Sequence, residues 1–109
     1  MQLFIDLKPL SVNKAWQGRR FKTEDYKNYE RDCLYLLPKG KKIYGYIDVK
    51  YDFYIKYFKT SDVGNFEKPL SDILVKSGII EDDKFIKRLI IEKHESKKQY
   101  IKITIREWT

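Results

Sequence analysis

The sequence predicts an α+β fold: a single small domain, residues 1–109, with one mixed β-sheet and two helices in the order β-α-β-α-β-β. Three observations support this class. One long segment alternates apolar and polar residues, two segments show helical spacing between capping and stop residues, and two further strand-like segments close the chain. With 109 residues, of which 42% are hydrophobic, the chain can bury a core without disulfide bonds.

The first strand is predicted over residues 2–7 and ends at Pro9, and the residues between there and the first helix are predicted to form a loop. The helix begins at Thr23, because threonine caps helices and the two carboxylates that follow it suit the positive end of the helix dipole. Apolar residues then recur at helical spacing, at Tyr26, Tyr29, Cys33, Leu36 and Leu37. Pro38 and Gly40 end this helix.

Residues 43–57 give the clearest strand signal. The apolar side chains share one parity, at Ile43, Ile47, Val49, Tyr51, Phe53, Ile55 and Tyr57, and most of the others are polar. At ~3.3 Å per residue the segment would span roughly 50 Å, which is long for one strand. We therefore expect a bend, or two strands joined near Gly45.

The second helix is predicted over residues 65–76. Asn65 can cap it, Pro69 lies in its first turns where a missing N–H costs least, and Gly78 supplies a C-terminal stop. Two strands follow, at residues 85–93 and 100–107. If the first of these pairs near the end of the long strand, acidic groups from both can meet.

The chain carries a net charge of +7, which favours an anionic partner such as nucleic acid. The basic residues between positions 7 and 23 interleave with aromatic ones. The candidates for contacts with DNA phosphates are Asn13, Lys14, Arg19, Arg20 and Lys22. A solvated basic loop is the alternative, and Trp16 can either stack on an unpaired base or plug the core or an interface.

Six carboxylates gather between positions 62 and 83, at Asp62, Glu67, Asp72, Glu81, Asp82 and Asp83. Two such charges about 4 Å apart repel by roughly 4 kcal/mol at an effective dielectric constant of 20, so a bound cation would stabilise the cluster. Oxygen ligands without cysteine or histidine suit Mg²⁺ or Mn²⁺. The alternative is structural: aspartates are common in turns, and Lys68 with Asp72 forms an ordinary i, i+4 surface pair.

The segment DVGNFEKPLSDILVKSGIIEDD, residues 62–83, together with KPLSVNKAW, residues 8–16, resembles the RusA family of Holliday junction resolvases. The family pattern has an aspartate, then Asp-Asn, a lysine three residues on, another aspartate and an Asp-Asp pair. The early segment matches the family's Pro-x-Ser-x-Asn signature through Pro9, Ser11 and Asn13. The resemblance covers most of the chain.

The resemblance implies a small homodimeric endodeoxyribonuclease, dependent on Mg²⁺, that resolves four-way DNA junctions in recombination and repair. It implies Asp62, Lys68 and Asp83 as catalytic residues, with Lys68 also touching the DNA. Metal binding would fall to Asp62 and Asp83, with Asp72 and Asp82 in support. Gly64 departs from the family, because an acidic residue usually precedes the asparagine. The alternative function is therefore a non-catalytic module that binds branched DNA.

Cellular context is predicted from composition. The one cysteine, Cys33, excludes an intramolecular disulfide and fits a reducing compartment. No apolar stretch approaches the ~20 residues that span a bilayer. We expect a cytoplasmic protein without membrane contact, and the resemblance implies a bacterial cell or a phage or prophage genome. His94, the one histidine, has no partner that the sequence identifies.

Overall fold

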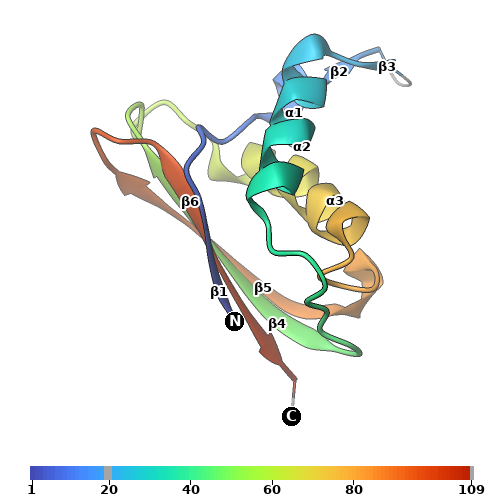
Figure 1. Cartoon of the computed structure of the whole chain (residues 1–109). Helices are drawn as coiled ribbons and strands as arrows, with labels where there is room; N and C mark the ends of the chain where they lie inside the picture. The colour runs from blue at the N-terminus through green and yellow to red at the C-terminus, as the bar shows by residue number, and fades with distance from the viewer. Residues whose placement is uncertain (19–20, 109) are drawn as a thin grey trace.

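The computed structural model describes residues 1–18 and 21–108. Its main sheet is mixed, with the strand order β1-β6-β4-β5, and two helices cover one face of it (Figure 1). The strands are β1 (Gln2–Ile5), β4 (Ile47–Ile55), β5 (Ile86–Glu95) and β6 (Tyr100–Glu107), and the helices are α2 (Glu24–Leu36) and α3 (Glu67–Ser77). The predicted fold class is confirmed.

The core lies between the sheet and the two helices. The predicted apolar parity of β4 is confirmed, since its odd-numbered side chains are all buried, at Ile47, Val49, Tyr51, Phe53 and Ile55. The Tyr51 hydroxyl shares a hydrogen bond of 2.8 Å with Ser71 Oγ, which ties β4 to α3 inside the core. Asp52 points to the other face of the sheet, yet only 5% of it is exposed.

Helix α2 begins as predicted, with the Thr23 side chain accepting a hydrogen bond from the backbone N–H of Tyr26. Leu36, which was predicted to belong to the apolar face, is 44% exposed, because Leu37 turns into the core instead. Gly78 ends α3 in the left-handed conformation, with φ of 82°, as its position predicted.

The predicted start of the second helix is wrong. A 3₁₀ turn, η1 (Val63–Phe66), precedes α3, and its cap is Asp62 rather than Asn65. The Asp62 side chain accepts a hydrogen bond from the backbone N–H of Gly64 at 3.1 Å. An aspartate followed by small residues competes well for this local role, since its short side chain reaches the N–H two positions on.

The predicted N-terminal loop is also more ordered than expected. It contains the short helix α1 (Val12–Ala15), capped by Ser11, and a small hairpin of β2 (Trp16–Gln17) and β3 (Phe21–Lys22). These elements are too short to produce a periodic signal in the sequence. Arg19 and Arg20 lie outside the described residues.

The expected bend in the long strand is confirmed. Strand β4 begins at Ile47, and Gly45 ahead of it has φ of 75°, a conformation that favours glycine. Before this bend, Ile43 forms an isolated parallel bridge with Ile80. Strand β5 pairs in parallel with β4, and β6 pairs antiparallel with it on the other side. No helix among residues 1–18 and 21–108 is long and apolar enough to cross a bilayer.

Candidate active site and DNA-binding groove

A groove of about 700 Å³ opens between the N-terminal segment, α2 and the loop after β4. Its walls include Pro9, Ser11, Asn13, Lys14, Tyr29, Tyr57, Ser61, Asp62, Asn65 and Phe66. Two sequence segments that are separated by about fifty positions in the chain therefore share one groove. They are the Pro-x-Ser-x-Asn signature and the first part of the acidic motif.

Asp62 and Asn65 are held together by one turn of the groove wall. The Asn65 N–H donates to the Asp62 backbone carbonyl at 3.1 Å, while the Asp62 side chain accepts from Gly64. A Cβ placed on Gly64 would stand 3.4 Å from Asp62 Oδ1. The position at which the RusA pattern quoted above has an acid thus lies directly against the Asp62 carboxylate.

Lys68, in the first turn of α3, joins two carboxylates from different segments. Its Nζ lies 2.9 Å from Asp72 Oδ1 and 3.1 Å from Asp83 Oδ2. Hydrogen bonds to Asp72 and then to Asp83 raise the pKa of Lys68, so the ammonium stays charged. Hydrogen bonding by Lys68, followed by contact with Asp82, lowers the pKa of Asp83. The cluster is half-exposed and presents one cation among several acids.

The predicted metal ligands fall into two groups. Asp62 lines the groove, whereas Asp72 and Asp83 meet at Lys68. The parallel pairing explains the division, because Ile86 at the start of β5 pairs with Ile47 at the start of β4, and Asp62 follows the other end of β4. Within the described part of the chain, no three of the predicted carboxylate ligands bring oxygens within 4.8 Å of one another.

The residues predicted to contact DNA differ in whether their side chains already contact other residues of the protein. Asn13 and Lys14 are exposed and line the groove. Lys22 instead donates to Glu30 at 2.8 Å, so it takes part in an internal ion pair. Trp16 packs edge-on against Tyr26, with ring centroids 5.5 Å apart, which favours its structural role over stacking on a base. Arg19 and Arg20, also predicted to contact DNA, lie outside the described residues.

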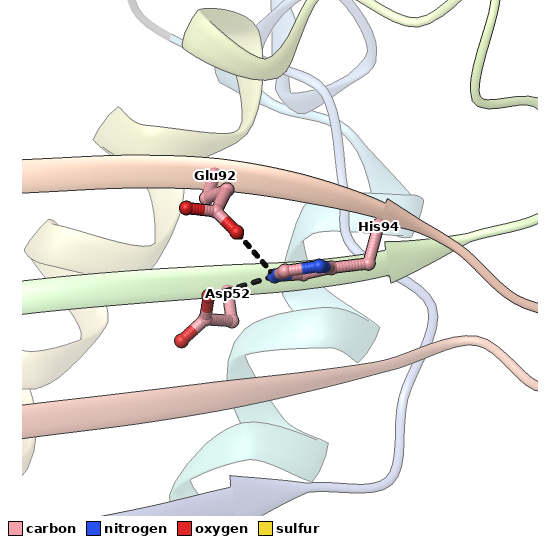
Figure 2. Close-up of side chains that lie close together, drawn as sticks. All are labelled: Asp52, Glu92 and His94. Atoms are coloured by element: carbon pink, nitrogen blue, oxygen red, sulfur yellow. Dashed lines mark hydrogen bonds and ion pairs between the residues drawn. The ribbon is translucent and has the colours of Figure 1, made fainter.

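The sequence reading missed a second cluster of ionisable groups. His94 on β5 contacts Asp52 on β4 and Glu92 on its own strand (Figure 2). Sequence analysis identified no partner for His94, and the fold supplies these two. Period-two patterning placed these side chains on one face of each strand, but only the strand order brings them together.

The fold and the two polar groups around α3 define a small nuclease-like domain with acidic and basic residues on adjoining segments. The chain matches the family model described as endodeoxyribonuclease RusA over residues 8–106, which is nearly its whole length. It belongs to the RusA family and is an endodeoxyribonuclease, a hydrolase that acts on branched DNA. No curated protein matches the chain.

Proposed function

We propose that this endodeoxyribonuclease resolves four-way DNA junctions by metal-dependent phosphodiester hydrolysis. The observation that carries the proposal is the cluster in which Lys68 joins Asp72 and Asp83. Lys68 follows Asn65 and Phe66 of the groove wall by two to three positions, so the cluster adjoins the segment that would hold the DNA. The family match supports the reaction class.

The carboxylates fit the hard cations that family membership implies. Asp72 and Asp83 approach one Nζ within 3.1 Å, and this geometry supports a site in which their oxygens face a single small cation. We propose that Asp62 and Asp83, supported by Asp72 and Asp82, hold Mg²⁺ or Mn²⁺, which requires the two groups to move toward each other when the ion binds. When bound, such an ion activates water and neutralises charge on the phosphate.

Lys68 has a second role in this proposal. Its ammonium neutralises charge that develops on the phosphate during hydrolysis, and its contacts with Asp72 and Asp83 keep it both charged and oriented. A phosphate that approaches Lys68 replaces one carboxylate as its partner. Lys68 is therefore proposed both as a catalytic residue and as a DNA contact.

The DNA surface extends from this cluster along the groove. We propose that Asn13 and Lys14 contact the phosphates, and that Lys22 and the neighbouring Arg19 and Arg20 extend this contact. A backbone contact of this kind weakens steeply as salt rises. A four-way junction presents two symmetric strands to cut, so a twofold homodimer would place one active site on each. The role we propose is recombination and repair in the bacterial cytoplasm, performed by a single domain.

The test is cleavage of a labelled synthetic four-way junction beside linear duplex of the same arms, with Mg²⁺ and with Mn²⁺. We expect paired symmetric nicks in the junction alone. Asp62→Asn and Asp83→Asn should abolish the nicks while leaving junction binding intact. Asp6→Asn is the matched control, because Asp6 is exposed, pairs with Lys98 at 3.4 Å and is not among the residues that line the groove.

Two outcomes would contradict the proposal in different ways. Normal cutting by either variant would show that the catalytic carboxylates are assigned to the wrong residues. Tight junction binding by the unaltered protein without nicks in either metal would instead favour a binding module. The lost ligand at Gly64 is the observation that favours this second function.

A further inference from the structure

The face of the sheet that the helices leave uncovered carries a cluster of three metal-ligating side chains. Asp52 on β4 pairs with Glu92 on β5 in the parallel register, and His94 lies two residues further along the same face of β5. Figure 2 shows the three side chains in front of the strands, with the helices behind them. The cluster is thus separated by the sheet from α3 and its Lys68.

The distances within the cluster suit a metal ion. His94 Nε2 lies 2.8 Å from Asp52 Oδ1 and 3.3 Å from Glu92 Oε2, and one ligand atom from each residue lies within 4.8 Å of the others. Two ligands that are each ~2.1 Å from an ion are ~3.0–3.4 Å apart in octahedral or tetrahedral geometry. Only small side-chain movements would be needed to close around an ion.

The cluster is also preorganised. The His94 ring stacks on Tyr54 at 4.5 Å between centroids, and Tyr54 stacks in turn on Tyr100 at 4.2 Å. This stack fixes the plane of the imidazole with Nε2 toward the carboxylates. Asp52 is 95% buried, since its exposed fraction is 5%, so its carboxylate has little freedom to turn away. A side chain held in this way loses little entropy when it binds an ion.

The lysine nearest to the cluster holds it only loosely. Lys50 Nζ lies 3.6 Å from Asp52 Oδ1 and 3.9 Å from Glu92 Oε1, which are ion-pair distances without a close hydrogen bond. Its side chain is 39% exposed and can move into water. Lys50 therefore neutralises the carboxylates in the absence of metal and leaves when an ion arrives.

We propose that Asp52, Glu92 and His94 bind a first-row transition metal ion, with Zn²⁺ as the best fit, at a site distinct from the acidic motif. One imidazole nitrogen and two carboxylate oxygens select such ions over Mg²⁺, which prefers oxygen ligands alone. The ion would link β4 to β5 and leave outward positions open to water. This assignment does not depend on the proposed function.

The test is titration of the whole protein with Zn²⁺ by calorimetry, and with Co²⁺ by visible absorption. We expect the protein to bind Zn²⁺ at this site. The Zn²⁺ affinity of His94→Gln should be lower by more than about 10-fold, which is the loss expected when only an outer-shell contact is removed. The Zn²⁺ affinity of Glu92→Gln should fall similarly. Because Glu92 is exposed, this substitution should not disturb folding, so a loss of affinity can be assigned to the lost ligand. Lys50→Gln should bind more tightly than the unaltered protein, because the competing ammonium is gone.

Asp83→Asn is the control that separates the two sites, and its Zn²⁺ affinity at this site should not change. The His94→Gln variant should also keep its junction cutting in Mg²⁺. The proposal is overturned if the protein binds no Zn²⁺, or if His94→Gln binds it as tightly as the unaltered protein. Unchanged or weaker binding by Lys50→Gln would equally refute the assignment of these carboxylates.

Discussion

Replacing Gly64 with aspartate would return to the acidic motif the carboxylate that the family pattern has there. Gly64 does not have a positive φ, so its backbone accepts a side chain. A Cβ there would lie 3.4 Å from Asp62 Oδ1, which is ordinary van der Waals contact. The new carboxylate would therefore stand beside that of Asp62 without requiring the turn to move.

The magnitude follows from the charges. Two carboxylates about 4 Å apart repel by about 1 kcal/mol in water and about 4 kcal/mol at an effective dielectric constant of 20. Both positions are exposed, so the lower part of this range applies. Without metal, Gly64→Asp should lower the free energy of unfolding by about 1–2 kcal/mol, or roughly 4–8 °C in Tm for each kcal/mol.

Added Mg²⁺ should reverse the sign of this effect. If the added carboxylate tightens Mg²⁺ binding about 100-fold, saturating Mg²⁺ stabilises the variant by about 2.7 kcal/mol more than the unaltered protein, which exceeds the repulsion. The assay is thermal unfolding with a chelator and with saturating Mg²⁺, followed by junction cleavage under the second condition. We expect the variant to melt below the unaltered protein in chelator, to melt above it in Mg²⁺, and to cut faster.

Gly64→Asn is the matched control, because it adds a side chain of the same shape without the charge. It should show neither the loss of Tm in chelator nor the gain in Mg²⁺. If Mg²⁺ shifts the Tm of both variants and of the unaltered protein equally, the new carboxylate does not bind the ion. The reasoning that position 64 is a metal-ligand position beside Asp62 would then be wrong.

Two further predictions concern the packing that holds α3 in place. Burial raises the pKa of Glu30, but hydrogen bonds from Lys22 and Lys76 outweigh it and lower the pKa from 4.5. The stability that this carboxylate adds is therefore complete above pH 4.5 and is lost as the pH falls further. Glu30→Gln should lower the free energy of unfolding by about 1–3 kcal/mol at neutral pH and by little at pH 3. Urea unfolding at both pH values measures this, and an equal cost at the two would contradict it. Tyr51→Phe should lower the free energy of unfolding by about 1–3 kcal/mol, because it leaves the buried Ser71 hydroxyl without its partner. The double variant with Ser71→Ala should recover most of that loss, and a double-mutant cycle measures the coupling between the two residues.

Features that depend on neighbouring residues were predictable from the sequence. The apolar parity of β4, the Thr23 cap and the left-handed Gly78 each follow from local backbone chemistry. The start of α3 was misplaced because a 3₁₀ turn, capped by Asp62 through its hydrogen bond from Gly64, takes up the residues before the helix. The N-cap position of α3 is then Phe66, which has no capping side chain and gives no signal in the sequence.

Features that depend on strand order were not predictable. The cluster at His94 requires β5 to lie parallel to β4 in one register, which pairs residues forty positions apart. The candidate site shows the same limit. The motif identified Lys68 and Asp83 as separate catalytic residues, but not that a direct contact of 3.1 Å joins them. Nor did it predict that Asp62 would line the groove while Asp83 stands with Lys68.

The lysines of this basic protein differ in how tightly they hold its carboxylates, and that difference separates structure from function. Glu30 is held at 2.6 Å and 2.8 Å by two lysines, and its side chain is only 13% exposed. An ion or phosphate would have to break both contacts in a nearly closed space. The cluster of Glu30, Lys22 and Lys76 therefore stabilises the fold and is a poor candidate for a ligand site.

Lys68 and Lys50 each contact a carboxylate that a ligand can reach, since the side chains of Asp83 and Glu92 are 43% and 52% exposed. Lys68 is 56% exposed, so it can exchange a carboxylate for a DNA phosphate while its charge stays compensated. Lys50 stands 3.6 Å from Asp52 and has no close bond to lose when an ion replaces it. Anions should therefore compete at Lys68 and cations at Lys50. Sulfate, a phosphate-like dianion that binds Zn²⁺ only weakly, should inhibit junction binding without affecting Zn²⁺ affinity on the opposite face, and a parallel loss of both would show that the two faces are coupled.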